Sequence, residues 1–570
     1  MNKTLLKESI DIANQRKKAD LMLKNCKIVD VFSGKIIDGN IAIFDKYIIG
    51  IGDYQANREI DIKGKYVCPG FMDSHIHIES TLLSVKEASK LMVINGTTTI
   101  VADPHEIVNV LGKTGFNYML NSGKNCHLDI KYMIPSCVPC TEFETSNSVF
   151  SATEIEEYLS HESVLGLGEF MDSFSVNQCS DQALLKIDAT IKANKIIDGH
   201  SPFLAGHQLD GYLIPRIRSD HECTTVQEAN DRIARGMYVA LRQGTASQNI
   251  KQLLPAVNKY NARYFTLCSD DREVKTLIEK GHITELLKIC VENNIDTIEA
   301  IRMATINIAE CYGLKDRGAI APGLLANLTI VDNLTDFNVA KVFINGELIV
   351  DNGKYLKEIP DEDLSLLTNS INVKNFSIDR LKLKLSNSLV PVIGVKQDVI
   401  ISKKEYKTVS LNSNNEFIYD PNNDVLKLAV VERHKSTGNI GLGLISGLGL
   451  KEGAIALTIA HDSHNIIVAG TSDEYIYDAV TKLMNMGGGI VVLNGTHEYK
   501  LPLPIAGLMS DRSYREVYND ITLIHNNLDT TIKEPLGLLS FMALPVIPEL
   551  RVTDKGLFDV LKHEFISYSN

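Results

Sequence analysis

The sequence lacks any apolar run long enough to cross a membrane. No stretch of 18 uncharged apolar residues occurs among its 570 residues, whereas a transmembrane helix needs about 20. The first 30 residues also lack the apolar core that a signal peptide requires. We therefore expect a cytoplasmic protein with no membrane partner.

An excess of basic residues is also missing. Acidic residues outnumber Lys and Arg by 71 to 58, which gives a formal net charge of −13. A nucleic-acid-binding surface needs the opposite balance because it must neutralise phosphates. Hydrophobic residues make up 44% and charged residues 23% of the chain, values that are ordinary for a globular protein and argue against disorder. We expect a folded protein that acts on a small molecule and has no nucleic-acid partner.

The ten cysteines show no zinc-finger pattern. Cys137 and Cys140 have CxxC spacing, but a structural zinc site would need a second pair of ligands at similar spacing, and none follows. The scattered cysteines are typical of reduced, buried thiols. The HxE at 77–79 and this CxxC superficially resemble the motifs of cytidine deaminases. Ser136 stands where that motif has proline, and the separation is long, so we set this interpretation aside.

The chain is too long for one hydrophobic core, and two or three domains are expected. Two segments, 21–68 and 323–356, consist of short strand-like runs with polar breaks. They predict a small β-sandwich built from both flanks of an inserted domain. The region after about residue 375 is rich in β-branched residues and glycine and is long enough to fold separately as an α+β domain. The predicted domains are 1–68 (first part of the sandwich), 69–312 (inserted domain), 313–360 (completion of the sandwich) and 375–570 (C-terminal domain).

The inserted segment alternates strand-like apolar runs with helical patterns such as 151–161 and 181–194. Regular βα alternation predicts an α/β fold, a (β/α)8 barrel of the TIM type, whose catalytic groups lie at the C-terminal ends of the strands. The eight predicted strands, of which the sixth is short, are 71–77, 97–105, 129–137, 164–172, 195–200, 214–222, 237–244 and 263–270.

The first predicted barrel strand ends in His75-Ile76-His77. Residues i and i+2 of a strand face the same side, so both imidazoles point together, as one metal ion requires. An HxH alone fits two surface histidines equally well. Further metal-ligand residue types stand at the ends of later strands, and all would converge at one barrel mouth. This mixture of nitrogen and oxygen donors suits Zn, Mn or Fe. The later residues are Glu169, His200, His221 and Asp270.

These residues lie in motifs that resemble a known family. PGFMDSHIHIEST (69–81) is similar to the opening motif of the amidohydrolase superfamily, and the order of the later ligands matches it too. Within that superfamily the chain resembles the adenine deaminases over nearly its full length, including the C-terminal domain that most amidohydrolases lack. The segments that carry this resemblance are HIHIEST (75–81), VADPHEI (101–107), SCVPCTEFETS (136–146), GEFMD (168–172), DGHSP (198–202), SDHECT (219–224) and AHDSHNIIVAG (460–470).

The resemblance implies hydrolytic deamination of adenine to hypoxanthine and ammonia, a reaction of purine salvage. It implies two divalent ions, with Mn²⁺ preferred over Fe²⁺ or Zn²⁺, and free adenine as the small-molecule partner; it also allows a homodimer. The arrangement of metal ligands does not determine which substrate is bound. The alternative is therefore an amidohydrolase that acts on a cyclic amide or on another nucleobase. An inactive binding or scaffold protein is the third interpretation, although every expected ligand position is filled.

The resemblance also implies roles for the six residues. Each pair of histidines would hold one ion. Glu169 would bridge the two ions, where many relatives use a carboxylated lysine. Asp270 would bind the first ion and shuttle a proton to the leaving ammonia, so that Glu169 and Asp270 are the catalytic residues. Asp271 is the rival for that role, but its side chain is expected to point to the other face of the strand. The two pairs are His75 with His77 and His200 with His221.

Weaker candidates stand near the same strand ends. His207, Glu222 and Arg242 fit outer or surface positions better than the pocket, although Glu222 is kept among the candidates for substrate contact. In the C-terminal domain, His461, Asp462 and His464 could form another metal site, although a loop over the pocket mouth or a buried hydrogen-bond cluster fits better. The candidates for contact with the substrate are His105, Glu106, Glu222 and Asp271.

Overall fold

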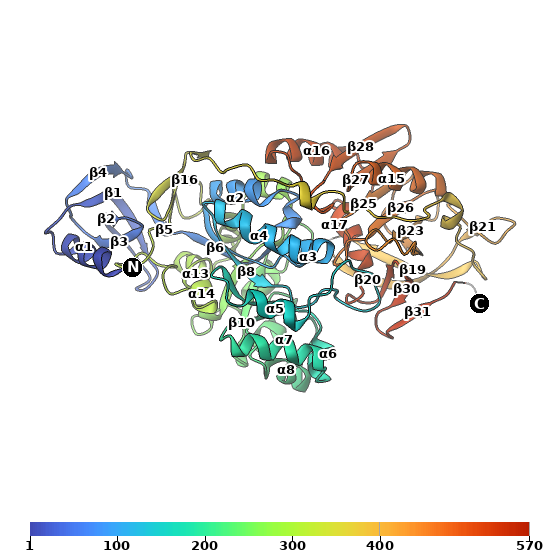
Figure 1. The fold of residues 1–570 in the computed structure, drawn as a ribbon, viewed down its shortest axis with the longest axis horizontal. Helices are drawn as coiled ribbons and strands as arrows, with labels where there is room; N and C mark the ends of the chain where they lie inside the picture. Colours follow the sequence, from blue (N-terminus) through green and yellow to red (C-terminus); the bar gives the residue numbers. More distant parts are fainter. Residues whose placement is uncertain (398, 569–570) are drawn as a thin grey trace.

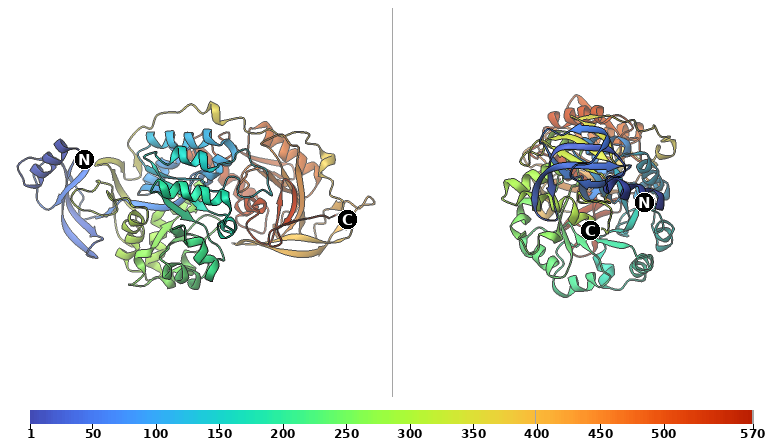
Figure 2. Two further views of the ribbon diagram at one scale, coloured as in Figure 1. Left: turned by 60° about the horizontal axis from the view of Figure 1, so that its bottom comes forward. Right: turned by 90° about the vertical axis from the view of Figure 1, so that its left-hand side faces the viewer.

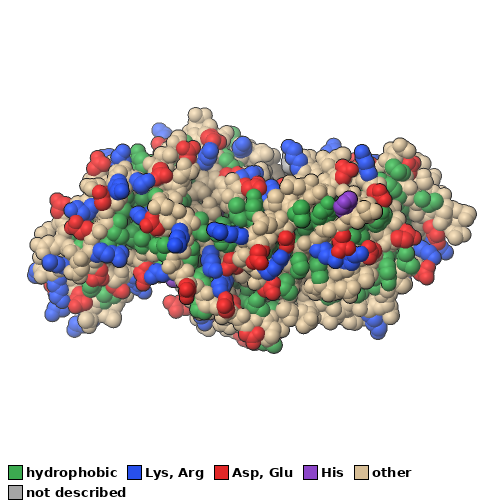
Figure 3. Space-filling view, turned by 90° about the horizontal axis from the view of Figure 1, so that it is seen from above, with side chains coloured by type: hydrophobic (Ala, Val, Ile, Leu, Met, Phe, Trp, Pro, Cys, Tyr) green, Lys and Arg blue, Asp and Glu red, His purple; other side chains and the backbone are tan. Residues whose placement is uncertain are grey.

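The computed structural model describes residues 1–397 and 399–568. Three regions follow one another along the long axis of the molecule: an N-terminal β-sheet, a central α/β barrel and a C-terminal region (Figures 1 and 2). No helix in the described part of the chain is both long and apolar enough to cross a membrane. On the face seen in Figure 3, acidic and basic side chains are intermixed, as the modest charge imbalance of the sequence leads one to expect.

The central barrel is made of parallel strands. One sheet has the order β10-β9-β8-β7-β6-β14, and a second has the order β11-β12-β13. A parallel bridge between Ile197 and Ile217 joins the two sheets on one side. On the other side β14, which continues β13 after one residue, pairs with β6 and closes the ring. The predicted TIM-type barrel is confirmed. Its strands are β6 (Phe71–His77), β7 (Thr97–Ala102), β8 (Asp129–Ile134), β9 (Val164–Phe170), β10 (Ile196–Gly199), β11 (Ser219–Asp220), β12 (Tyr238–Arg242), β13 (Phe265–Cys268) and β14 (Asp270–Asp271).

The barrel helices begin where short polar side chains cap them. The hydroxyl of Ser151 accepts from a backbone N–H of the first turn of α5, and Glu154 returns a contact to the cap, which forms a capping box. Thr225 and Glu228 do the same at α9. The helices are α2 (Val85–Ile94), α3 (His105–Leu111), α4 (Lys113–Asn125), α5 (Ala152–Tyr158), α6 (Ser173–Asn177), α7 (Asp181–Lys192), α8 (Gly206–Leu213), α9 (Val226–Ala234), α10 (Ile250–Leu253), α11 (Val274–Lys280), α12 (Ile283–Glu292), α13 (Thr297–Met303) and α14 (Ile306–Cys311).

The two flanks of the barrel meet in one nine-stranded sheet. Strand β5 pairs with β1 on one side and with β15 on the other, so the chain that enters the barrel lies beside the chain that leaves it. The joining of both flanks therefore agrees with the sequence analysis, while their packing as a sandwich stays a prediction. Helix α1 (Lys3–Ala13) precedes the strands β1 (Ala19–Asp30), β2 (Lys35–Phe44), β3 (Tyr47–Ile51), β4 (Ala56–Asp61), β5 (Tyr66–Pro69), β15 (Leu328–Val331), β16 (Val339–Ile344), β17 (Glu347–Asp351) and β18 (Lys354–Tyr355).

The C-terminal region is built on an eight-stranded sheet of order β20-β19-β24-β23-β26-β25-β27-β28. Its helices are α15 (Asp473–Asn485), α16 (Tyr514–Asn527) and the short α17 (Pro535–Ser540). A hairpin-like sheet of β29 (Leu550–Thr553), β30 (Gly556–Asp559) and β31 (Glu564–Ile566) completes it. The strands of the large sheet are β19 (Leu389–Lys396), β20 (Val399–Thr408), β23 (Val425–Val431), β24 (Ile440–Ser446), β25 (Ala454–Leu457), β26 (Ile466–Gly470), β27 (Gly489–Asn494) and β28 (His497–Pro502).

Polar contacts fasten the C-terminal region to the barrel. The buried carboxylate of Asp554 accepts hydrogen bonds from the backbone N–H of Thr145 at 2.8 Å, from its hydroxyl at 2.7 Å and from the Asn439 amide at 3.0 Å. Asn465 donates to the carbonyl of Thr145 at 2.9 Å. The loop after β8 is thereby held against the C-terminal region, which lies over the barrel mouth.

Removing the Asp554 carboxylate should weaken this attachment. Asp554→Ala leaves three partly buried donors without their acceptor, and we expect a loss of roughly 2–3 kcal/mol at this contact. Thermal unfolding and limited proteolysis of the loop at 141–150 measure the effect. The exposed Asp529→Ala is the control. Equal unfolding curves and equal cleavage of that loop in the two variants would contradict the fastening role.

Candidate active site and metal centre

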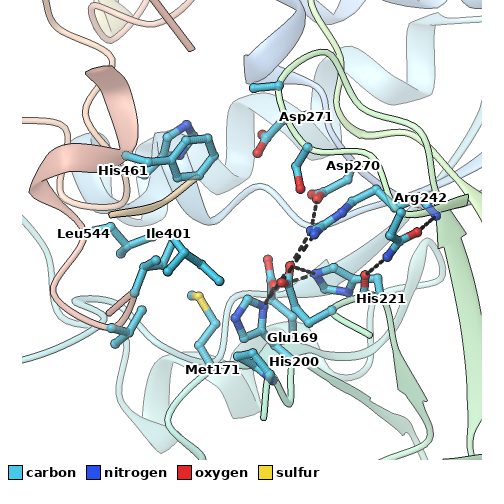
Figure 4. Close-up of a pocket in the computed structure, with 18 of the residues that line it drawn as sticks. Glu169, Met171, His200, His221, Arg242, Asp270, Asp271, Ile401, His461 and Leu544 are labelled. Atoms are coloured by element: carbon cyan, nitrogen blue, oxygen red, sulfur yellow. Dashed lines mark hydrogen bonds and ion pairs between the residues drawn. The ribbon is translucent and has the colours of Figure 1, made fainter. Parts of the chain in front are cut away.

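Five of the six predicted ligands line a cavity of about 260 Å³ at the C-terminal ends of the barrel strands, and the sixth, His75, lies beside His77. The barrel supplies its floor, and the C-terminal region supplies residues that close it from the opposite side (Figure 4). The cavity is lined by His77, His105, Glu169, Met171, His200, Pro202, Phe203, His221, Glu222, Thr224, Arg242, Ala246, Ser247, Gln248, Asn249, Gln252, Asp270, Asp271, Ile401, His461, Asp462, Phe541, Leu544, Val546, Ile547 and Pro548.

His75 and His77 lie at the end of β6 and present their imidazoles to one point, as the i, i+2 spacing predicts. Their Nε2 atoms are 3.2 Å apart. His77 Nδ1 lies 2.8 Å from the carbonyl oxygen of Asp103. A carbonyl can only accept, so Nδ1 carries the hydrogen and Nε2 keeps a free lone pair. This is the tautomer that a metal ligand needs.

Glu169 lies between the two pairs of histidines. Its side chain is at the end of β9 and is 3% exposed. One carboxylate oxygen, Oε1, is 3.3 Å from His77 Nε2 and 3.7 Å from His75 Nε2. The other oxygen, Oε2, is 2.9 Å from His200 Nδ1 and 3.3 Å from His221 Nε2. Each oxygen therefore faces one pair, which is the geometry that a carboxylate bridging two cations requires.

Asp270 faces the same point from β14. Its Oδ1 is 3.1 Å from His77 Nε2, and its Oδ2 accepts a hydrogen bond of 2.7 Å from Arg242 Nη1. The same guanidinium nitrogen also contacts Glu222. Arg242, which the sequence analysis assigned to an outer or surface position, is buried and fixes the orientation of the Asp270 carboxylate. One oxygen is held in this way, and the other is directed to the centre of the site.

The expectation that Asp271 points away from the site is wrong. Asp271 lines the cavity, and the hydroxyl of Ser80 donates to its Oδ1 (Figure 4). The physical reason is the backbone of Asp270, which has a φ of 55°. A left-handed residue breaks the alternation of an extended strand, so two consecutive aspartates both reach the barrel mouth.

The other candidates for substrate contact divide into two groups. His105 and Glu222 line the cavity together with Asp271. Glu106 is not among the described residues that line it: its buried carboxylate accepts from the Ser80 hydroxyl at 2.9 Å, behind the wall. His105 is the first residue of α3, whereas the sequence analysis had placed it at the end of the second barrel strand. His207 is fully exposed on α8 and lies outside the site, in agreement with its surface assignment.

Burial and charge act against each other on these groups. Burial alone would raise the pKa of Glu169, but hydrogen bonds from His200, His221 and His77 hold it well below its ordinary value. Burial also opposes ionisation of Asp270, yet the Arg242 guanidinium and His77 keep its pKa low. Burial raises the pKa of Asp198, which lies 4.0 Å from His75 Nδ1, to about 7. The carboxylates of Glu169 and Asp270 are therefore anionic donors at neutral pH.

The donor set fits divalent cations. Nitrogen lone pairs and carboxylate oxygens converge at one end of the cavity, a combination that borderline metals such as Zn, Mn and Fe bind. No cysteine of the described chain belongs to a cluster of this kind. The Ser136 hydroxyl, which precedes the CxxC pair, instead donates to the Glu169 carbonyl at 2.5 Å. The groups whose donor atoms lie within reach of one ion include His75–His77–Asp270, His75–Glu169–His221, His77–His105–Glu169 and His200–His221–Glu222.

Sequence reasoning missed several residues that support this centre. Asp103 accepts from the backbone N–H of Glu169 at 2.9 Å and contributes the carbonyl that fixes His77. Tyr312 donates to Asp198 at 2.9 Å. Asp462, which the sequence analysis named without a link to the metal centre, has its Oδ1 3.7 Å from His105 Nε2. Asp103 and Asp198 follow or end apolar strand-like runs, so strand-end position was an available signal for both.

Two family models match the chain. The amidohydrolase family matches residues 66–349, and the adenine deaminase C-terminal domain matches residues 400–564. "Adenine deaminase 2" of Desulfotalea psychrophila is 49% identical over the whole of both chains. "Adenine deaminase" of Ligilactobacillus salivarius is 44% identical over 100% of this chain and 99% of its own, and that of Clostridium acetobutylicum is 44% identical over 98% and 100%. The barrel mouth carries the predicted ligands, and the relatives match the chain from end to end. The chain therefore belongs to the adenine deaminase family.

Proposed function

We propose that this protein hydrolyses free adenine to hypoxanthine and ammonia, with two divalent ions held at the barrel mouth. The observation that carries the proposal is the position of Glu169, whose two oxygens each face one pair of histidines. The names of the full-length relatives support adenine as the substrate. The reaction supplies hypoxanthine, as purine salvage requires.

The first ion would be held by His75, His77 and Asp270, and the second by His200 and His221, with Glu169 between them. Manganese is the ion we propose, because a site with two carboxylates among its ligands suits a harder cation than an all-nitrogen or thiolate site does. Iron and zinc are the alternatives. When bound, such ions supply a nucleophilic oxygen at neutral pH because they lower the pKa of water.

Asp270 is the proton carrier in this proposal. Its Oδ1 lies at the centre of the site, where it can take a proton from the attacking water. The same oxygen then delivers the proton to the amino nitrogen on C6 as the carbon–nitrogen bond breaks and ammonia leaves. Arg242 holds Oδ2, so the carboxylate is already oriented when substrate arrives.

The cavity suits a flat base. Its metal-ligand residues lie at the barrel floor, whereas Ile401, Leu544 and Val546 contribute apolar surface from the C-terminal region. Adenine can place C6 at the floor and its ring faces against apolar side chains. The division into 1–68, 69–312, 313–360 and 375–570 is the domain organisation we propose, with the last region closing the substrate site.

The bridging role of Glu169 predicts the metal content. Protein reconstituted with excess Mn²⁺ should approach two ions per chain. The metal content of Glu169→Gln should fall to one ion or none, because a neutral amide lacks the charge of a bridging carboxylate. Elemental analysis after gel filtration measures this. Glu144→Gln, a change at a buried glutamate outside the ligand set, should keep both ions. Saturation of the unaltered protein near one ion would refute the bridge.

The substrate assignment predicts discrimination between base and nucleoside. Adenine should be turned over readily, while adenosine should have a kcat/KM lower by roughly 10²-fold or more, because its ribose does not fit the closed cavity. Ammonia release measures both. Equal rates for the two, or no release from adenine by metal-loaded protein, would remove support for the proposal. Dihydroorotate and cytosine in the same assay separate it from cyclic-amide hydrolysis and from deamination of another base.

The roles of Asp270 and His200 predict different defects. Asp270→Asn should retain much of the metal but lose about 10²–10⁴-fold in kcat, because a proton carrier is removed. His200→Ala should lower the metal content itself. His207→Ala, at an exposed histidine on α8, is the matched control for the second change. An Asp270→Asn enzyme with nearly full kcat would contradict the proton-carrier role.

A further inference from the structure

His461 brings an imidazole from the C-terminal region into the cavity. It lies in the loop between β25 and β26, and its ring stacks on Phe541 with centroids 4.4 Å apart and an interplanar angle of 14°. The residue is 6% exposed and lines the cavity opposite the metal-ligand residues (Figure 4). Stacking fixes the plane of the ring, so its nitrogen atoms are held at constant positions.

The ring nitrogens of His461 have no hydrogen-bond partner among the residues that the structure describes. Two neighbouring imidazoles each have one ring nitrogen paired: His77 Nδ1 with the Asp103 carbonyl, and His464 Nδ1 with the backbone N–H of Ala460. A buried polar group without a partner costs free energy. A partner for His461 is therefore expected to come from a molecule inside the cavity.

A metal ion is not the partner that the geometry favours. Glu106, His461 and His464 are close enough to surround one cation. However, His464 Nδ1 accepts the N–H of Ala460 at 3.2 Å, which leaves the hydrogen on Nε2. Nε2 lies 3.4 Å from Glu106 Oε2 and, because it carries the hydrogen, has no lone pair for a metal. A cation would therefore keep only two ligands.

We infer that His461 is a specificity-determining residue, which donates a hydrogen bond to N3 on the N3–N9 edge of the purine. The inference rests on the proposed function. The reacting C6 must face the barrel floor, so the opposite edge of the base, which carries N3 and N9, faces the C-terminal region. An imidazole nitrogen held there recognises a base with a free N9. A ribose on N9 would occupy the same position.

The test compares binding with turnover. His461→Ala should raise the KM for adenine and the Kd of the product hypoxanthine by roughly tenfold to hundredfold, the effect of one buried hydrogen bond. Its kcat should change less than about threefold, and two metal ions should remain. His461→Asn, which keeps a donor and an acceptor, should recover part of the affinity. Val546→Ala, at an apolar residue lining the same cavity, is the matched control.

Analogues locate the contact. In the unaltered enzyme 3-deazaadenine should bind more weakly than adenine, and His461→Ala should weaken it no further, because the contact is already absent. 7-Deazaadenine should show the full effect of His461→Ala. In Val546→Ala all three bases should be affected alike.

Four results would overturn the inference. They are an unchanged KM and Kd in His461→Ala, an equal loss for all three bases in that variant, a fall in kcat alone, and the loss of one metal ion. Failure of the unaltered, metal-loaded enzyme to deaminate adenine would instead contradict the proposed function, and the inference with it. If the unaltered enzyme deaminates adenine and His461→Ala has the same KM and Kd as the unaltered enzyme, only the inference is contradicted.

Discussion

The structure of the site depends on one buried carboxylate. Glu169 is almost completely removed from water, and an isolated anion in that position would be strongly unfavourable. The position of Glu169 is defined by four imidazoles around its two oxygens. The Asp103 carboxylate, which accepts a hydrogen bond from the backbone N–H of Glu169, also helps to fix it. These imidazoles come from three different barrel strands or the loops that follow them, so the barrel must close for the carboxylate to be compensated. Negative charge is then concentrated where divalent cations are needed, and folding and metal binding are linked at this residue.

Closure of the barrel mouth by the C-terminal region has an electrostatic consequence. Asp462 lies beside His105, whose other ring nitrogen is 3.5 Å from Glu169 Oε1. Aspartate, imidazole and glutamate thus form a row from the C-terminal region to the centre of the site, and the Asp462 carboxylate holds the pKa of His105 well above its usual range despite burial. Excluding water from the cavity strengthens each of these interactions. A barrel without this region would keep its ligands but would have an open, wetter pocket.

Most of the barrel and its ligands could be predicted from sequence because both depend on local periodicity. An apolar run that ends in His, Glu or Asp places that residue at the mouth, and this rule found all six central residues. The rule failed at Asp271, because it assumes an extended backbone and Asp270 has a positive φ. It undervalued Arg242, whose importance comes from two partners, Glu222 and Asp270, that are distant in sequence. Contacts from the C-terminal region, about 200 residues further along the chain, have no periodic signal. The sequence analysis left a loop over the pocket mouth and a buried cluster open for His461, and the folded structure shows that this residue lines the cavity.

In this proposal the chemistry and the selectivity of the enzyme come from different parts of the chain. Every group proposed to hold metal or move a proton lies on the barrel, where rigid strand ends keep distances short and constant. The groups opposite them, His461 and the apolar side chains beside it, come from loops of another region. A change in those loops alters which ring edge is recognised without disturbing the ions below, because no proposed ligand to an ion is supplied from there. The converse does not hold: loss of Glu169 would remove the charge on which both the ions and His105 depend, and through His105 the contact with Asp462. The barrel can thus keep its reaction while the C-terminal region varies, and the base that is accepted should depend on the residues at 461 and 541–548.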